Sequence, residues 1–354
     1  MKKYNKYEDW VELVSESLPE IPKIITEEWL KEQLLDRSSY FRNWGFCFND
    51  LSNYQFEENI DFNIIRKVPF STKTIFPEKH PFHFNKENIF YVDKEIKDLH
   101  NKGINGNGIN VAVIDFAYET VPSEIEESLV SYKNCTEEIE NHFHGIITST
   151  QICGKNLGVA PKSKLWFYGT RQGKNHINDT ILGLEYIYEQ NEKGANIKII
   201  SIPASNHRLN PEYEKIREKL MKQGCYIIDS PIFGENFTSI NQDPNTGELY
   251  YSDWQLLPDT YDEMKSKIAI KTGGKMTPLV TTKDEYLYCG QATYSWSIPI
   301  LSGYFALALQ INPDLTYDEF IDLVNDTKKN ENGIMLFNIN DVIEKMQNEH
   351  LKKR

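Results

Sequence analysis

The chain has 354 residues, 40% of them hydrophobic, which is enough for one large domain or two with a sizeable core. Its 52 acidic and 39 basic residues give a net charge of −13, which argues against a nucleic-acid-binding surface and favours neutral or cationic partners. No stretch approaches the roughly 20 apolar residues of a spanning helix, and the N-terminus lacks the apolar core of a signal peptide. We therefore expect a cytoplasmic protein that binds neither nucleic acid nor membrane.

Residues 1–90 are predicted to form an N-terminal extension with two helices, over 7–18 and 26–35. Thr26 is a suitable cap for the second helix, because a threonine hydroxyl can accept a hydrogen bond from a free backbone N–H. The aromatic, proline-punctuated stretch that follows has no clear period. Three roles stay open for this region, namely a removable pro-segment, a docking module and a structural wrap.

Residues 91–354 alternate between strand and helix patterns, which is typical of a parallel sheet with right-handed crossovers. The sequence therefore predicts the α/β class. Strands are expected over 109–115, 165–168, 197–202 and 225–228, and helices over 179–192 and 211–222. Further along the chain we expect a hairpin or loop over 243–257, a short strand over 267–271, a capping box from Thr316 to Glu319 and a charged helix over 341–350.

The segment 296–309 predicts a helix buried on all sides, because its only polar side chains are Ser297, Ser302 and Tyr304. Pro299 requires that this helix begins only a few residues earlier, where backbone N–H groups have no intrahelical partner to lose. Ser295 is then at the helix N-terminus, beside free N–H donors and the positive end of the helix dipole. A nucleophile that attacks a carbonyl needs such surroundings, although a plain N-cap role is the alternative.

Asp115 and His144 complete a possible acid, base and hydroxyl set. Asp115 ends the strand predicted over 109–115, at the edge where open α/β sheets hold ligands, although it could also cap a turn. His144 precedes Gly145, which has no side chain and so lets the imidazole approach a neighbouring strand. The chain order Asp, His, Ser is one of the orders known for acyl-transfer triads.

At these residues the chain resembles the subtilisin-like serine proteases, the subtilases of peptidase family S8. The family's G-x-G-V-x-V-A-V-I-D strand is similar to GINGNGINVAVID in this chain. The family's H-G-T-H-V-A-G and G-V-A-P are similar to HGIITSTQICG and GVAP. The family's G-T-S-M-A-x-P-x-V-A-G-x-A-A-L is similar to TYSWSIPILSGYFALAL. The resemblance covers about residues 93–346. It implies a subtilisin-like parallel sheet flanked by helices, with Asp115 as the triad acid, His144 as the base and Ser295 as the nucleophile.

The chain departs from the family where the oxyanion and the substrate are bound. Phe233 stands at the place of the family's oxyanion asparagine, so Asn236 is the candidate donor, with a turn role as the alternative. The backbone N–H of Ser295 is a donor in either case. The family's substrate-pairing S-L-G becomes Ser201-Ile202-Pro203, and its small A-A-G wall becomes Ser230-Pro231-Ile232. Ser201, Ser230 and Pro231 are therefore the substrate-binding candidates. Pro203 removes a main-chain donor from the substrate-pairing edge, and together with the change at residues 230–232 this suggests a narrow substrate preference.

The resemblance thus predicts a selective intracellular serine endopeptidase that processes peptide or protein substrates, with a peptide precursor as one possibility. A catalytically impaired pseudoprotease that binds or regulates is the alternative, and a hydrolase of another kind is the third. No cofactor is required by this chemistry. Calcium is a common structural ion in the family but no oxygen-ligand loop is recognisable.

Other site types find little support in the sequence. His142 and His144 have the spacing of a strand ligand pair, but no third metal ligand lies close by. The five cysteines are odd in number and lack C-x-x-C spacing, so we expect reduced, buried thiols rather than disulfides or a zinc site. The oligomeric state cannot be read from the sequence.

Overall fold

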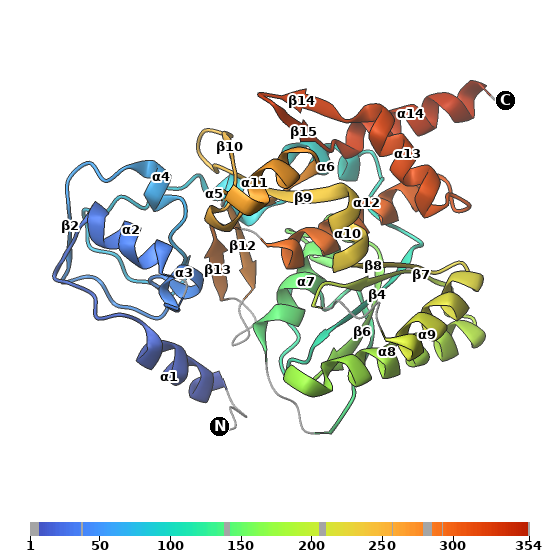
Figure 1. The fold of residues 1–354 in the computed structure, drawn as a ribbon, viewed down its shortest axis with the longest axis horizontal. Coiled ribbons are helices and arrows are strands. Elements are labelled where there is room, and N and C mark those ends of the chain that lie inside the picture. Colours follow the sequence, from blue (N-terminus) through green and yellow to red (C-terminus); the bar gives the residue numbers. More distant parts are fainter. Residues whose placement is uncertain are drawn as a thin grey trace.

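The computed structural model describes residues 7–36, 38–137, 142–204, 210–256, 258–278, 285–291 and 293–352. Figure 1 shows an N-terminal region, drawn in blue, beside a larger part that contains the main sheet. A hairpin of two strands, β12 (Lys275–Pro278) and β13 (Tyr286–Cys289), lies between the two. Residues 1–6 and 37 of the predicted N-terminal extension lie outside the described residues.

Within the described residues, five parallel strands form the main sheet in the order β5-β6-β4-β7-β8. This arrangement confirms the predicted α/β class. The edge strand β5 was not predicted, because it lies in an acidic stretch and its side chains are only partly covered. The strands are β4 (Asn110–Phe116), β5 (Leu129–Asn134), β6 (Lys164–Thr170), β7 (Ile197–Ile202) and β8 (Tyr226–Asp229).

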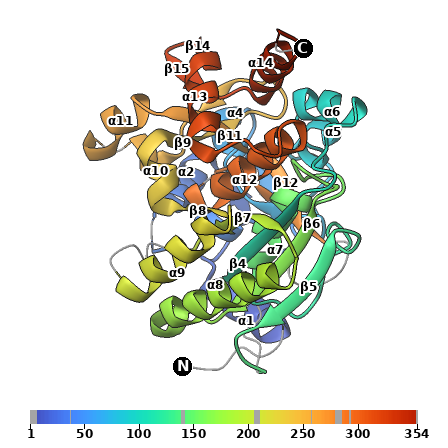
Figure 2. The same ribbon diagram turned by 90° about the vertical axis from the view of Figure 1, so that its right-hand side faces the viewer.

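Helices cover both faces of this sheet (Figures 1 and 2). Successive strand residues point to opposite faces, so Val111 and Val113 of β4 pack with α7 (Phe143–Cys153) and α12 (Tyr294–Ile311). Ala112 and Ile114 pack on the other face, with residues from two further helices. Those helices are α8 (His176–Glu192) and α9 (Pro211–Lys222).

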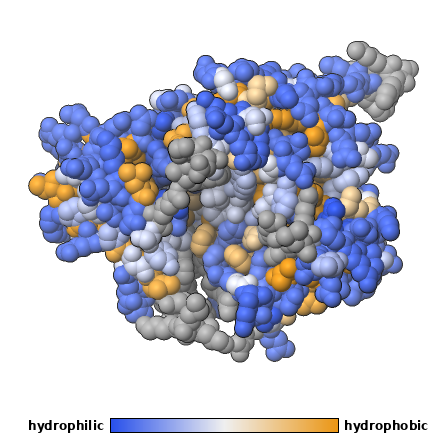
Figure 3. All heavy atoms as spheres, in the orientation of Figure 1, coloured by the Kyte–Doolittle hydropathy of each residue, from blue (hydrophilic) through white to orange (hydrophobic). Residues whose placement is uncertain are grey.

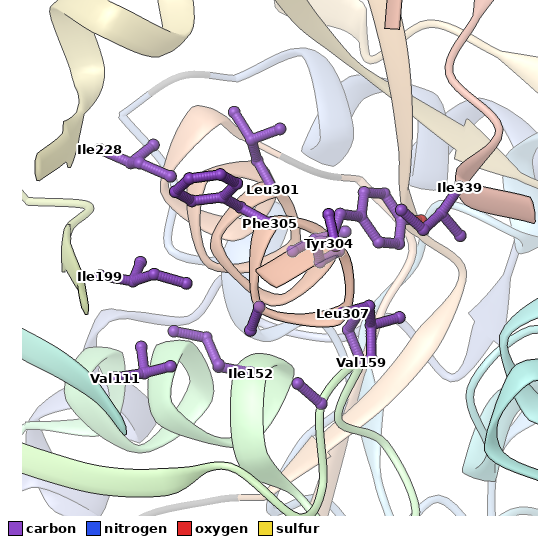
Figure 4. Packing of buried hydrophobic residues seen from close by; sticks show 14 of the residues in the cluster. Val111, Ile152, Val159, Ile199, Ile228, Leu301, Tyr304, Phe305, Leu307 and Ile339 are labelled. Carbon is purple, nitrogen blue, oxygen red and sulfur yellow. The ribbon is translucent and has the colours of Figure 1, made fainter. Parts of the chain in front are cut away.

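Helix α12 passes through the centre of the largest core (Figure 4), as its apolar sequence predicted. Every residue from 297 to 309 is buried. Leu301 and Phe305 lie among side chains of the sheet, including Ile199 and Ile228. Pro299 is the sixth residue of the helix rather than part of its first turn, so the carbonyl of Ser295 lacks the N–H donor that position 299 would otherwise supply.

A second, mixed sheet packs beside α12 and, in the described residues, has the strand order β10-β9-β11-β15-β14. Its strands are β9 (Phe237–Gln242), β10 (Leu249–Tyr250), β11 (Ile268–Gly273), β14 (Lys329–Glu331) and β15 (Ile334–Leu336). The helices around it are α10 (Ser230–Asn236), α11 (Pro258–Lys265), α13 (Tyr317–Thr327) and α14 (Ile339–Lys352). The predicted capping box of α13 is present, with Thr316 and Glu319 bonded to each other's backbone N–H.

The N-terminal region consists of short elements around an aromatic core. Thr26 caps α2 as predicted, by accepting a hydrogen bond from the N–H of Trp29. The aromatic stretch without a clear period supplies Phe70 and Phe82 to this core. The elements are α1 (Tyr7–Ser17), β1 (Ile24–Ile25), α2 (Glu27–Leu35), α3 (Phe41–Trp44), β2 (Gln55–Phe56), α4 (Phe62–Ile65), β3 (Phe70–Ser71) and α5 (Lys86–Phe90), followed by α6 (Lys94–Asn101).

The surface in Figure 3 is mostly hydrophilic, with apolar side chains scattered over it. No helix in the described ranges is long and apolar enough to cross a membrane. All five cysteines are free thiols, and three of them are buried, whereas Cys135 and Cys289 are partly exposed.

The central role of α12 predicts which substitution destabilises the fold most. Phe305→Ala should lower the free energy of unfolding by about 3–5 kcal/mol, because it leaves a cavity in the core. The matched control Leu182→Ala, at a 47% exposed position of α8, should change it by less than about 1 kcal/mol. Urea denaturation measures both; equal losses would contradict the packing described.

Candidate active site

Asp115 lies near the end of β4 and is fully buried. Its Oδ1 and Oδ2 atoms are 2.7 and 2.9 Å from Nδ1 of His144. The hydroxyl of Thr148 donates to Oδ2 over 2.7 Å, and the backbone N–H of Phe116 donates to Oδ1 over 2.7 Å. A carboxylate with this set of donors is held in one orientation.

The pKa of Asp115 reflects two opposing effects. Burial acts to raise it, since a charged carboxylate is poorly solvated there. Attraction to His144, together with the hydrogen bonds from His144, Thr148 and Phe116, outweighs burial and lowers the pKa below its usual value. Asp115 is therefore ionised at neutral pH and can stabilise a positive charge on the imidazole.

His144 is the second residue of α7, and its side chain is 12% exposed. The helix begins here because Nδ1 of His142, at the N-cap, accepts a hydrogen bond from the His144 N–H over 3.2 Å. A Cβ atom at Gly145 would lie 2.2 Å from the carbonyl oxygen of Phe116. The missing side chain thus lets α7 approach β4 closely enough for His144 to reach Asp115, the close approach that the sequence predicted.

Aromatic rings enclose the imidazole of His144. Its ring centre is 5.0 Å from that of Trp296 and 5.5 Å from that of Phe116. Because Nδ1 faces Asp115, the other ring nitrogen, Nε2, lies on the opposite edge of the imidazole. The ring is held in a single orientation by these contacts.

Ser295 is the second residue of α12, which packs against α7. Its hydroxyl is partly exposed and donates to the carbonyl oxygen of Pro203 over 3.4 Å. In the described part of the chain, no hydrogen bond joins Ser295 to His144. The start of α12 lies beside His144 because the ring of Trp296, the residue after Ser295, packs on the His144 ring.

The N-terminus of α12 has no side-chain cap, because the N-cap residue Thr293 makes no capping hydrogen bond. In the first turn of α12 the N–H of Trp296 donates to the Thr293 carbonyl over 3.1 Å. The backbone N–H of Ser295 lies at the positive end of the helix dipole, which favours a negative charge placed beside the Ser295 hydroxyl.

In the described residues, no hydrogen bond joins Asn236 to Ser295. We expected a loop after β8, but residues 230–236 form helix α10, and Asn236 is its last residue. Asn236 lines a surface pocket together with Arg217 of α9 and Tyr317 of α13. The helix forms because the Asp229 side chain accepts from the N–H of Ile232 and Pro231 is tolerated in the first turn.

The three substrate-binding candidates lie on two neighbouring elements. Ser201 is fully buried on β7, where its backbone pairs with Val113 of β4 and Ile228 of β8. A substrate strand therefore cannot pair at Ser201 itself. Ser230 and Pro231 are partly exposed at the start of α10, so they remain accessible.

Sequence reasoning missed two contributors to this site, Thr148 and Trp296, and the start of helix α10 beside it. Thr148 lies four residues after His144, on the same helix face, so its spacing could have indicated the contact with Asp115. The pair Asp229 and Pro231 is a helix-start signal that could have predicted α10. The contact of Trp296 with His144 depends on how two distant helices pack, and no local signal predicts it.

No group of three or more His, Cys, Asp or Glu side chains that could hold a metal ion occurs in the described ranges. His142 has a different role, as the N-cap of α7. Burial and the nearby His144 lower the pKa of His142 to about 3, so its ring is neutral and can accept a hydrogen bond.

No protein-family model matches the chain. It is 24% identical over 143 residues to the major intracellular serine protease of Bacillus subtilis (strain 168), covering 36% of this chain and 43% of that protein. The chain thus matches less than half the length of this curated relative.

A solved structure, that of the prenylagaramide maturation protease PagA, matches over 72% of this chain and 99% of its own, with a TM-score of 0.50 and 16% identity. The fold is shared with a protease. At this identity the likeness shows the fold alone, an α/β arrangement with a parallel sheet flanked by helices, which agrees with the resemblance to subtilases.

The low pKa of His142 predicts a pH-dependent stability. Between about pH 6.5 and 3 the unfolded chain binds a proton at His142 that the folded chain does not, so stability falls as pH drops through this range. His142→Asn keeps a capping acceptor without a titrating ring. From pH 6.5 to 4.5 its free energy of unfolding should fall less steeply than that of the unsubstituted protein, by up to about 1.4 kcal/mol per pH unit. Identical slopes in urea denaturation would refute the assignment.

Proposed function

We propose that the protein is a serine endopeptidase that cleaves peptide bonds through Asp115, His144 and Ser295. The observation that carries the proposal is the buried pair of Asp115 and His144, 2.7 Å apart, beside the uncapped helix start that bears Ser295. Two proteins to which the chain is similar are proteases, which supports the same interpretation.

The chemistry assigns one role to each group. Nε2 of His144 takes the proton of the Ser295 hydroxyl while Oγ attacks the carbonyl carbon of the substrate. Asp115 stabilises the imidazolium ion that forms. The imidazolium then gives its proton to the leaving amine, and an acyl-enzyme remains. A water molecule, deprotonated by the same imidazole, hydrolyses this ester and restores Ser295.

The backbone N–H of Ser295 is the proposed oxyanion donor, because it lies beside the attacking hydroxyl in the first turn of α12 and no side chain from Thr293 caps it. Asn236 has no part in this proposal. To react, Ser295 must first leave its long hydrogen bond to Pro203 and turn towards His144. The proposal requires this rotation about the Cα–Cβ bond of Ser295, and a bound substrate that displaces the contact with Pro203 would favour it.

A peptide or protein is the proposed substrate, cleaved selectively inside the cell. Selectivity is supported by Pro203, which follows β7 and cannot donate a main-chain hydrogen bond to an extended substrate. One relative is named an intracellular protease and the structural neighbour a maturation protease, so processing of a peptide precursor is the specific form of the proposal.

A pseudoprotease is the second candidate, and a specific observation favours it. The Ser295 hydroxyl donates to Pro203 instead of His144, as it would in a site that binds without reacting. A module of this kind would retain the fold and the peptide-binding surface while lacking an activated nucleophile.

Labelling with a fluorophosphonate probe separates the two candidates. The unsubstituted protein should be labelled, and Ser295→Ala should lose at least about 1000-fold in labelling rate, since removing the nucleophile abolishes the covalent step. The control Ser302→Ala removes a hydroxyl that bonds only within α12 and should label normally. No labelling of the folded, unsubstituted protein would favour the pseudoprotease.

A further inference from the structure

The N-terminal region supplies a strand to the hairpin that leads to Ser295. Strand β3 pairs with β13, so that Phe70 lies opposite Tyr288 and Ser71 opposite Leu287. Strand β13 in turn pairs with β12 on its other side. Because β13 ends at Cys289, only a short connection separates this three-stranded sheet from the start of α12.

The hairpin also belongs to the apolar core of the N-terminal region. Tyr288 is fully buried, with its ring stacked on Phe70 at 5.0 Å and packed 4.7 Å from that of Phe84. Met276 of β12 is buried in the same cluster. Removal of residues 7–90 would expose these side chains to water, which opposes their removal because burial of apolar surface stabilises the folded state.

Arg66 joins the N-terminal region to the turn between β9 and β10 through its guanidinium group. The Arg66 side chain is only 6% exposed. Nη1 lies 3.1 Å from a carboxylate oxygen of both Asp243 and Glu248. The guanidinium also stacks 4.0 Å from the ring centre of Tyr250. Loss of Arg66 would leave the carboxylate of Asp243 buried without its countercharge, which is strongly destabilising.

Gly290 is held directly against the backbone of Arg66. A Cβ atom at Gly290 would lie 2.1 Å from the Arg66 carbonyl oxygen, so there is no room for any side chain. The hydroxyl of Tyr250 donates to the Gly290 carbonyl, and that of Tyr288 donates to the Arg66 carbonyl. These contacts hold the backbone in place at Gly290, which lies five residues before Ser295.

Lys67 makes a second connection of the same kind. Its Nζ is 2.6 Å from Oδ1 of Asp253. The N–H of Asp253 donates over 3.0 Å to the side-chain oxygen of Gln291, the residue after Gly290. Two consecutive residues of the N-terminal region therefore hold two consecutive residues of the segment that leads into α12.

We propose that residues 7–90 are a retained part of the working protein, and that Arg66 and Lys67 are positioning residues for the segment that carries Ser295. Retention follows from the shared strands and core. The positioning role rests on the proposed peptidase function, because it concerns the reactivity of Ser295. Neither residue touches the reacting atoms, so both act through Gly290 and Gln291.

Retention is tested by intact-mass spectrometry of the fluorophosphonate-labelled protein. The labelled species should still carry residues 7–90, and Ser295→Ala should have the same N-terminus. A labelled species that begins near residue 91, with an unprocessed Ser295→Ala chain, would overturn retention and leave the peptidase proposal intact.

If the probe does not label the protein, the peptidase proposal fails and retention is judged from folding. Thermal unfolding of the full-length chain should then show one cooperative transition, because the two regions share a core. Two separate transitions would overturn it.

Positioning is tested with Lys67→Met, which keeps an apolar stem but removes the ion pair to Asp253. The maximal labelling rate should fall about tenfold while the probe concentration for half-maximal rate and the Tm change little. Arg66→Lys keeps the positive charge but loses the planar guanidinium that stacks on Tyr250, so it should also lower the maximal labelling rate.

The control Arg217→Ala, which removes a surface pair with Glu214, should label at the normal rate. Normal labelling of Lys67→Met would overturn the positioning role. An unchanged maximal rate with a lower Tm would do the same, since it would mean that Lys67 only stabilises the fold. Should Arg66→Lys not fold, Lys67→Met decides the question alone.

Discussion

The structure of the site depends on one buried interaction, the contact between the Asp115 carboxylate and Nδ1 of His144. A buried carboxylate is stable only when it is paired and hydrogen-bonded, and here His144, Thr148 and Phe116 all contribute. The close approach of α7 to β4 at Gly145 makes the contact possible. Helix α12 completes the arrangement, because its buried core face fixes where Ser295 and Trp296 lie relative to α7.

The N-terminal region changes how this site is understood. A subtilase-like fold would place all of its chemistry in the part after residue 91, and the sequence offered no reason to connect the two. The structure connects them through a shared sheet, a shared aromatic core and the contacts of Arg66 and Lys67. Several of these contacts hold the segment before Ser295, so the N-terminal region is packed against the chain that leads to the site.

The sequence predicts an element when the pattern within that element alone is enough to identify it. Strands β4 and β7 and helix α12 are buried on all sides, so their apolar runs identify them whatever they pack against. Strand β5 is half exposed and polar, and β13 needs a partner from residues 70–71, so neither has a local signature. At α10 a local signal existed in Asp229 and Pro231. That segment is a helix rather than the expected loop, with Asn236 as its last residue, and the proposed oxyanion donor is the backbone N–H of Ser295 at the start of α12.

The rate of Ser295 modification in Asp115→Asn tests the central claim most directly. Asparagine fills the same space but removes the charge that orients and stabilises the His144 imidazolium. The account predicts that the second-order rate constant for fluorophosphonate labelling falls by about 10⁴, the order of loss that this change causes in turnover by a serine protease triad, while circular dichroism shows a folded chain. An unchanged rate constant would contradict the account, because His144 would then act without Asp115 or not at all.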